Sequence, residues 1–472
     1  MKQSNTADLG TGSVGKLLFS LSVPAILAQL INVLYNMVDR MYIGHIADVG
    51  ADALTGVGVT MPVILCISAF AALVSMGGAP RASIMMGKGN PEEAERILGN
   101  CTATLVLLSV ILTAGFQFFG HDVLMAFGAS ENTIGYAWAY MQIYSFGTVF
   151  VQMALGLNAF ITAQGFARTS MLTVLIGAVC NTVLDPIFIF GFDMGVRGAA
   201  LATIISQGIS CVWVVKFLLS RRTTLRIRRR NLRLSPHVIL PCLALGLAPF
   251  IMQLTESIIM VCFNTSLLKY GGDLAVGAMA ILMSVMQFAM LPLQGLTQGG
   301  QPIISYNFGA GKAGRVRRTF KLLVVSCFVY STVMWAISMF VPHLFITLFT
   351  ENAQLSAFTV WAIHIYMAAA LLFGIQIACQ QTFIALSNAK VSVFLALLRK
   401  VILIIPLIYL LPHIVPDPVM GVFLAEPVSD LIAVCTTAVT FVVVFRKTLR
   451  GMDAAQEEAS EPGGEPGGLQ GI

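Results

Sequence analysis

The chain has 472 residues, of which 57% are hydrophobic and 11% are charged. A soluble globular protein carries about 25% charged residues, so this composition excludes an ordinary water-soluble enzyme. It also excludes a disordered chain, which needs low hydrophobicity and many charges. The 28 basic and 22 acidic residues give a net charge of +6, but the basic residues lie in short clusters between long apolar runs. Lipid is therefore the expected partner, and nucleic acid is not.

Twelve apolar runs are long enough to cross a bilayer, since a span needs about 20 mostly apolar residues. The first six predicted spans are residues 17–43, 53–80, 97–119, 133–160, 168–191 and 196–219. The second six are residues 238–268, 274–300, 316–341, 356–385, 391–411 and 418–445. The runs are too long and too uniformly apolar for barrel strands, so the sequence predicts an all-α polytopic membrane protein.

The distribution of charge predicts the orientation. Most of the 28 Lys and Arg residues fall in the N-terminus, in the loops after even-numbered spans and in the C-terminus. The positive-inside rule therefore places both termini in the cytoplasm. The densest basic cluster, RRTTLRIRRRNLR at 221–233, lies between spans six and seven. It is interpreted as a topology anchor that joins two halves, with a contact to anionic lipid as the functional alternative.

The two halves of the chain resemble each other. Pro24 in SVPAILAQL matches Pro249 in LAPFIMQL, and FITAQG from Phe160 matches FIALSN from Phe383. Six spans per half give both halves the same orientation, which predicts a parallel repeat about an axis along the membrane normal. Repeats of this kind occur in transporters whose halves rock about a site near the midplane.

These observations predict two six-helix lobes and three flanking segments. The predicted segments are a cytoplasmic N-terminus at 1–16, an N-lobe at 17–219, a basic linker at 220–237, a C-lobe at 238–445 and a disordered cytoplasmic tail at 446–472.

Several motifs resemble a known family. They are the opening SVP…YNMVDRMYIGH, the loop GGAPRASIMMGKGNPEEA, the segment QGFARTSM and the run NTVLDPIFIFGFDMGVRGAALAT. The chain is similar to the multidrug and toxic compound extrusion (MATE) family, and within it to the bacterial multidrug exporters. The resemblance covers nearly the whole chain apart from the tail. It implies twelve helices in two lobes, a place in the bacterial inner membrane, ion-driven export of cationic amphipathic compounds, and a contribution to antibiotic resistance.

Ionisable side chains are costly inside a membrane and are therefore candidates for function. Five acidic residues lie within the predicted spans: Asp39, Asp185, Glu256, Glu426 and Asp430. Glu426 and Asp430 share one side of the last span and receive no role from the sequence.

Helical geometry brings some of these residues to one depth. Asp185 follows Arg168 on an outward-running helix, so it lies roughly 25 Å from the inner surface, in the outer half of the bilayer. Thr203 closely follows Arg197 on an inward-running helix and also lies in the outer half. Asn181 and Asp185 are four residues apart and share one helical face. Their oxygens can therefore converge within one lobe.

The family resemblance implies a cation-binding site at matching positions. These positions are Tyr35, Asp39, Asn181, Asp185 and Thr203. Pro24 matches a first-helix proline at which bending is expected to accompany protonation. The alternative interpretation is that Asp39 only pairs with Arg40 or caps a helix.

The second half does not repeat these polar residues. Asn264 falls opposite Asp39, while Ile404 and Ile408 fall opposite Asn181 and Asp185, so the ion site is expected in the N-lobe only. Glu256 is interpreted either as a charge that attracts cationic drugs into the substrate cavity or as a structural hydrogen-bonding group. The predicted cavity residues are Glu256, Gln253, Gln376 and Asn264.

The sequence thus predicts an antiporter that exports amphipathic organic cations by alternating access, driven by H+ or Na+. A buried carboxyl group favours its neutral form, which suits Asp39 to proton exchange. An all-oxygen site of Asp39, Asn181, Asp185 and Thr203 equally suits Na+. We expect a monomer without a cofactor, and no metal beyond a possible Na+.

Two other classes remain as alternatives. A flippase for a lipid-linked or anionic amphiphile belongs to the same wider superfamily, but it would need several basic cavity residues, for which only Arg399 and Lys400 are candidates. A membrane enzyme would need a catalytic motif, and HExxH, CxxC and GxSxG do not occur in the sequence. We therefore expect the protein not to be an enzyme.

Overall fold

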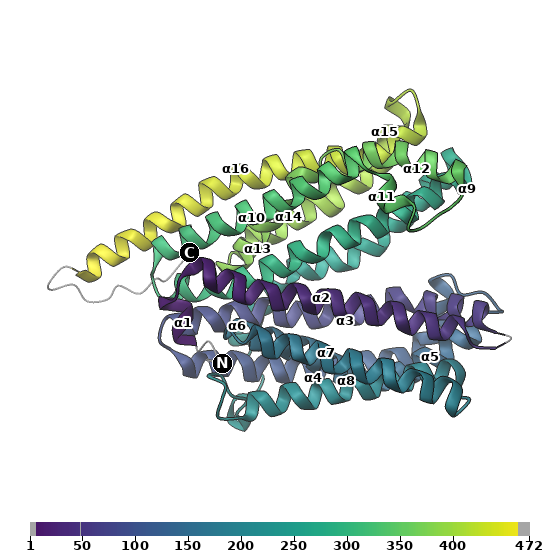
Figure 1. Cartoon of the computed structure of the whole chain (residues 1–472). Helices are drawn as coiled ribbons and strands as arrows, with labels where there is room; N and C mark the ends of the chain where they lie inside the picture. Colours follow the sequence, from purple (N-terminus) through teal and green to yellow (C-terminus); the bar gives the residue numbers. More distant parts are fainter. Residues whose placement is uncertain (1–5, 48, 461–472) are drawn as a thin grey trace. The chain divides into compact units, whose positions relative to one another are not determined.

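Helices are the only regular elements in the part of the chain that the computed structural model describes, residues 6–47 and 49–460 (Figure 1). A chain in hydrocarbon must satisfy its backbone polar groups internally, and a helix does this within each span. The first elements are α1 Thr6–Thr11, α2 Val14–Gly44, α3 Gly50–Gly87, α4 Pro91–Ala126, α5 Ile134–Phe146, α6 Thr148–Ala163, α7 Ala167–Pro186, η1 Ile187–Gly191, α8 Gly195–Leu219 and η2 Arg229–Asn231. The remaining elements are α9 Pro236–Gly309, α10 Ala313–Phe340, α11 His343–Ile346, α12 Ala353–Tyr366, η3 Ala370–Leu372, α13 Phe373–Ala385, α14 Ala389–Leu397, η4 Leu398–Leu403, α15 Ile404–Ile414 and α16 Pro418–Ser460.

The helices correspond to the twelve predicted spans. Among the described residues, nine helices are long and apolar enough to cross a membrane, and eleven spans result when each of two bent helix pairs counts as one. The 74-residue α9 is interrupted at Gly272, whose φ of 63° and ψ of −162° are not helical. The parts of α9 on either side of Gly272 are separate spans, which accounts for the twelfth.

The two bent spans occupy corresponding places in the two halves. The fourth span bends by 60° between α5 and α6, and the tenth bends by 51° between α12 and the segment Ala370–Ala385. The first bend falls at Gly147, where a Cβ would overlap the Ile204 side chain. Glycine combined with a nearby serine, here Gly147 and Ser145, is among the usual causes of a sharp helix kink.

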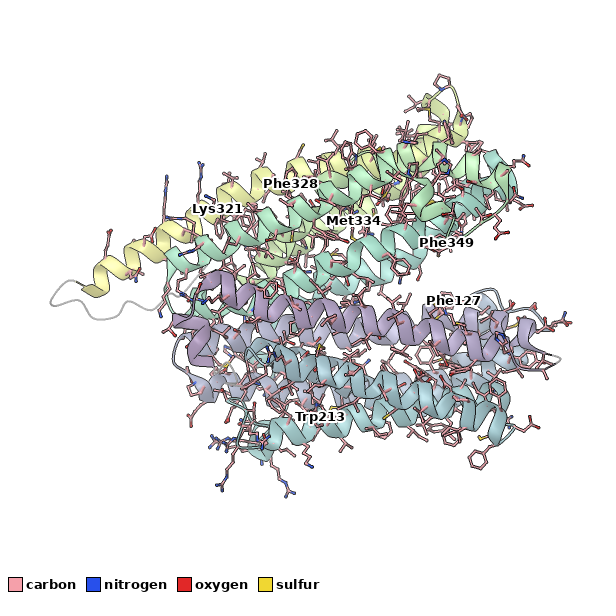
Figure 2. The ribbon with its side chains drawn as sticks, in the orientation of Figure 1. Phe127, Trp213, Lys321, Phe328, Met334 and Phe349 are labelled. Atoms are coloured by element: carbon pink, nitrogen blue, oxygen red, sulfur yellow. The ribbon has the colours of Figure 1, made fainter. Side chains whose placement is uncertain are left out.

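The outer faces of the helices carry large apolar side chains. Phe328 and Val329 on α10 are exposed, as are Trp213 on α8 and Phe127 after α4 (Figure 2). Exposed apolar surface of this extent marks a contact with membrane or protein. The same helices are long enough to span hydrocarbon, so these side chains are expected to face lipid.

The described chain divides into two compact units. Unit 1 contains Ser20–Ala82 and Pro91–Ser257, and unit 2 contains Ala7–Phe19, Ser83–Asn90 and the chain from Ile258 onward. The N-terminal segment belongs to unit 2 because Arg315 Nη2 donates to the carbonyl oxygens of Leu9 at 3.0 Å and Gly12 at 2.8 Å. The predicted lobes are defined by the internal repeat of the sequence, whereas these units are defined by contacts between residues. The lobe boundaries therefore stay a prediction.

Glycines explain why the start of α9 belongs to unit 1. A Cβ at Gly77 on α3 would overlap the Cys242 carbonyl on α9, and a Cβ at Gly246 would overlap the Leu73 carbonyl. The backbones of the two helices therefore touch at small residues, the usual means by which membrane helices pack closely.

The basic linker is held by the ends of unit 1 helices. Arg228 Nε forms an ion pair with Glu95 Oε2 at 2.5 Å. Gln164 Oε1 accepts from the Thr223 hydroxyl at 2.7 Å and from the Leu225 N–H at 2.9 Å. These contacts fix the linker against unit 1, and its interpretation as a topology anchor stays a prediction.

The predicted disordered tail is wrong for residues 446–460. This segment continues α16 as helix through Ser460. Its sequence contains AAQEEA, and Ala, Gln and Glu are good helix formers. Residues 461–472 lie outside the described residues.

The contact between α3 and α9 predicts a difference between two glycine variants. Gly246→Ala should destabilise the protein by about 1–3 kcal/mol, because an overpacked contact forces backbone shifts. Gly58→Ala on α3 should be neutral, since no atom lies within 4 Å of its added Cβ. Thermal melting of the detergent-solubilised variants checks this, and equal melting temperatures would contradict the proposed contact.

Candidate functional site

Two buried carboxyl groups lie within unit 1, on α2 and α7. Asp39 is 6% exposed, and Asp185 is fully buried. Their side chains lie close enough to interact with each other. Ionised carboxylates are acceptors only. A hydrogen bond between these two groups therefore requires a proton on one of them, and a cation between them would serve the same purpose.

Asn181 links Asp185 to α8, which lies beside α7 (Figure 1). Its Nδ2 donates to Asp185 Oδ1 at 3.1 Å and contacts Thr203 Oγ1 at 3.4 Å. The Thr203 hydroxyl donates to the Ala199 carbonyl at 3.0 Å, one turn earlier on α8. The i,i+4 spacing predicted the first contact, and the second requires that α7 and α8 pack side by side.

Two tyrosines complete the surroundings of the acids. Tyr35 lies one turn before Asp39 on α2 and is close enough to interact with both carboxyl groups. Tyr140 on α5 is buried, and its side chain lies close enough to Thr203 to interact with it. Sequence reasoning missed Tyr140. Tyr140 stacks on Tyr144, with ring centroids 5.9 Å apart. The signal that was available is the i,i+4 spacing of Tyr136, Tyr140 and Tyr144 within the predicted span.

Three oxygens of this group have no hydrogen-bond donor among the described residues. They are Asp39 Oδ1, Asn181 Oδ1 and Asp185 Oδ2, and all three are buried. Leaving a buried acceptor unsatisfied costs about 1–3 kcal/mol, and more for a charged group. Protons, water molecules or a cation can supply the hydrogen bonds or coordination that the protein side chains do not provide.

Neither carboxyl group has a basic partner at ion-pair distance in the described part of the chain. Within residues 6–47 and 49–460, no ion pair of 4.0 Å or less involves Asp39 or Asp185. Arg40 follows Asp39 in the sequence, but its side chain is exposed. The alternative interpretation, in which Asp39 only pairs with Arg40, is therefore wrong for this structure.

Pro24 is buried in the interior of α2, which continues as helix from Val14 to Gly44. Because proline has no N–H, it removes one backbone hydrogen bond and weakens the helix at that turn. The predicted bending role of Pro24 stays a prediction.

The predicted substrate residues fall in both units. Gln253 and Glu256 lie on the first part of α9 in unit 1, where Glu256 is exposed and Gln253 Oε1 is buried without a hydrogen-bond partner among the described residues. In unit 2, Asn264 is half-buried on α9 and Gln376 is buried on α13. Their role in binding substrate stays a prediction.

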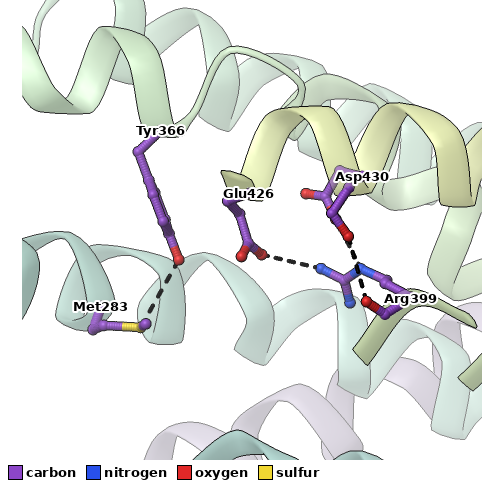
Figure 3. A network of polar contacts seen from close by, with 6 residues as sticks. Met283, Tyr366, Arg399, Glu426 and Asp430 are labelled. Atoms are coloured by element: carbon purple, nitrogen blue, oxygen red, sulfur yellow. Dashed lines mark hydrogen bonds and ion pairs between the residues drawn. The ribbon is translucent and has the colours of Figure 1, made fainter. Parts of the chain in front are cut away.

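Unit 2 contains a second pair of buried acids, and this pair has a basic partner (Figure 3). Arg399 Nε contacts Asp430 Oδ1 at 2.7 Å, and its Nη2 contacts Glu426 Oε1 at 3.3 Å. The guanidinium also lies 4.3 Å from the centroid of the Phe373 ring. Glu426 and Asp430, which the sequence left unassigned, thus share one basic partner, Arg399 of the neighbouring π-helix η4.

The Arg399 cluster predicts that loss of one charge is worse than loss of all three. Arg399→Met should reduce the yield of folded protein, because breaking a buried ion pair costs about 3–5 kcal/mol. Combining Arg399→Met with Glu426→Gln and Asp430→Asn should restore much of the yield. Size-exclusion profiles in detergent measure this, with Arg317→Met, an exposed arginine, as control. A triple variant that folds no better than Arg399→Met would contradict the charge argument.

Comparisons with known proteins agree with the architecture. The MatE family model matches residues 24–187 and 249–410, so the two matches begin at the two prolines that the internal repeat pairs. Multidrug export protein MepA of Staphylococcus saprophyticus is 25% identical over 435 residues, which cover 92% of this chain and 95% of that protein. MepA of Staphylococcus aureus strain NCTC 8325 is 25% identical over 403 residues, which cover 84% and 87%.

Solved structures share the fold. The MATE multidrug transporter DinF-BH has 33% sequence identity and a TM-score of 0.86, covering 94% of this chain and 98% of that chain. A MATE in the bent conformation has 20% identity and a TM-score of 0.89, covering 96% and 100%. The predicted fold class, with two lobes, twelve helices and an internal repeat, is confirmed. Because the family model covers more than half of the sequence, the chain belongs to the MatE family and is a multi-pass membrane efflux transporter.

Proposed function

We propose that the protein exports amphipathic organic cations from the bacterial cytoplasm in exchange for H+ or Na+ bound at Asp39 and Asp185. The observation that carries this proposal is the facing pair of buried carboxyl groups, each with an oxygen that has no donor among the described residues. Two ionised carboxylates so close together repel each other, and burial removes the water that would stabilise them. Binding of a proton or a cation relieves both penalties.

The ligand chemistry suits either ion. A proton can be shared between the two carboxyl groups, and its binding and release need no other side chain. Na+ is a hard cation that prefers oxygen ligands, which Asp39, Asp185, Asn181 and Thr203 can offer. Tyr35 and Tyr140 are donors that can stabilise the pair when it is ionised.

Ion binding can drive export only if it favours one conformation over another. Asp39 and Pro24 lie on the same helix, α2. Neutralising Asp39 removes a charge from this helix, and the weakened turn at Pro24 is the place where a change of bend costs least. We propose that ion occupancy at Asp39 selects the bend of α2 and so couples to alternating access of the substrate site.

The proposed substrates follow from the relatives. The MepA proteins are named for multidrug export, and DinF-BH is described as a multidrug transporter. Glu256 is exposed and can attract a cation, and Gln253, Asn264 and Gln376 would supply polar contacts. The many Met and Phe residues, 23 and 30 in the chain, suit an adaptable surface for varied ligands. We place the protein in the cytoplasmic membrane with both termini inside.

A flippase for anionic lipids finds less support. Recognition of a phosphate group calls for basic side chains that can turn to the ligand. Arg399, one of only two candidates in the sequence, already contacts Glu426 and Asp430.

The coupling role predicts the effect of removing one carboxyl group. Asp39→Asn should abolish drug efflux without loss of folded protein, because the amide has nearly the same shape but cannot exchange a proton or bind a cation as strongly. The same change at an exposed position, Asp122→Asn, should leave efflux unchanged. Efflux of ethidium, a fluorescent organic cation, from a pump-deficient bacterial strain measures both variants. Normal efflux by Asp39→Asn would disprove the coupling site.

Contacts among the site residues predict that they act as one unit. Asn181→Ala and Asp185→Asn should each reduce efflux strongly, yet add little to the loss caused by Asp39→Asn. A double-mutant cycle on the initial efflux rate checks this. Additive losses would show that the residues serve separate sites.

A further inference from the structure

A cavity of about 50 Å³ lies against Asn181 and Thr203, the side chains that join α7 and α8 beside the acids. Four helices contribute further polar residues to its wall. These are Asn32 on α2, Asn158 on α6, Thr173 on α7, and Ser206, Gln207 and Ser210 on α8. A buried water needs about 10–15 Å³ and two to four polar partners, so this cavity can hold several water molecules.

From Asn181 and Thr203, which lie beside the acid pair, the cavity extends in one direction only. Thr173 lies eight residues before Asn181 on α7, about 12 Å along the helix axis. Ser206 and Ser210 follow Thr203 on α8, and Asn32 precedes Asp39 on α2. With the N-terminus in the cytoplasm, α2 and α7 run outward and α8 runs inward. All of these polar residues then lie on the cytoplasmic side of the acids.

Polar groups continue beyond the cavity to the ends of α6 and α7. Asn158 Nδ2 donates to the Ser170 carbonyl at 3.3 Å, and the Thr162 hydroxyl donates to Ser170 Oγ at 2.9 Å. Thr162 and Ser170 are half-buried, and Arg168, at the start of α7, is exposed. The polar side chains therefore form a nearly continuous series from the acid pair to the ends of these helices.

The lining can accept hydrogen bonds or coordinate an ion along this series. Asn158 Oδ1 is buried and has no donor among the described residues. Ser206 and Ser210 donate to the carbonyls of Ala202 at 2.7 Å and Thr173 at 3.1 Å, and a hydroxyl that donates keeps lone pairs that can accept.

We infer that this series is a release passage within unit 1, through which H+ or Na+ leaves Asp39 and Asp185 for the cytoplasm. The inference rests on the proposed ion coupling at the acid pair. A cavity of this size admits water, a hydrated proton or a dehydrated Na+, but it excludes a drug.

Filling the cavity tests the passage. Ser206→Leu and Ser210→Leu should each slow ion-driven drug export in proteoliposomes about tenfold, equivalent to a barrier raised by about 1.4 kcal/mol. Ion binding at the acid pair, measured as Na+ or H+ uptake by the solubilised protein, should persist. Val212→Leu places the same side chain on the exposed side of α8 and should export normally.

Because Ser206 is buried, leucine at this position can impair folding, so a smaller variant provides a second readout. Ser206→Cys should react with a small thiol reagent added to inside-out vesicles, above the background of the nine native cysteines. A bulky reagent should not reach it. Failure of the small reagent to react from the cytoplasmic side would overturn the passage.

The outcome separates the passage from the proposed function. If Asp39→Asn abolishes export while well-folded Ser206→Leu and Ser210→Leu export at the Val212→Leu rate, the passage is wrong and the coupling site stands. If Asp39→Asn exports normally, the coupling site itself fails, and the passage fails with it.

Discussion

The cost of an uncompensated charge in hydrocarbon determines how the two halves of this transporter differ. Each unit buries a pair of carboxyl groups. In unit 2, Arg399 contacts both Glu426 and Asp430, so a fixed protein group compensates part of their charge. In unit 1, Asp39 and Asp185 face each other without a basic partner among the described residues. The first pair has a fixed cationic partner, whereas the second has none among the described residues, which is why we propose that it takes up an ion from outside.

Both acid pairs lie beside an irregular stretch of helix. The π-helix η1 begins at Ile187, two residues after Asp185, and the π-helix η4 contains Arg399. A π-turn widens the helix and changes the direction of the side chains next to it, and such turns are frequent at functional sites. In unit 2 this geometry presents Arg399 to two residues of α16. In unit 1 the π-helix η1 begins directly after Pro186, which lacks a backbone donor and itself follows the buried Asp185.

Local patterns in the sequence were sufficient for the features that depend on one helix. Apolar length predicted the spans, and the i,i+4 spacing predicted the contact between Asn181 and Asp185. Features that depend on the packing of distant helices could not be predicted. Tyr140 reaches Thr203 only because α5 packs near α8, and Arg399 finds its acids on another span. The 60° bend at Gly147 depends on neighbouring side chains. The helical continuation of α16 to Ser460 depends on helix propensity, which the length of an apolar run does not reveal.

The central claim is that the Asp39–Asp185 pair carries the coupling ion, and substrate-driven ion flux tests it most directly. In proteoliposomes, a gradient of ethidium across the membrane is imposed, and the opposite movement of H+ or Na+ is followed with a pH dye or radioactive sodium. The wild-type protein is expected to move one of these ions against the drug, and Asp39→Asn is expected to move neither. Equal ion flux by the two proteins, or drug flux by the wild type that moves no ion, would contradict the account.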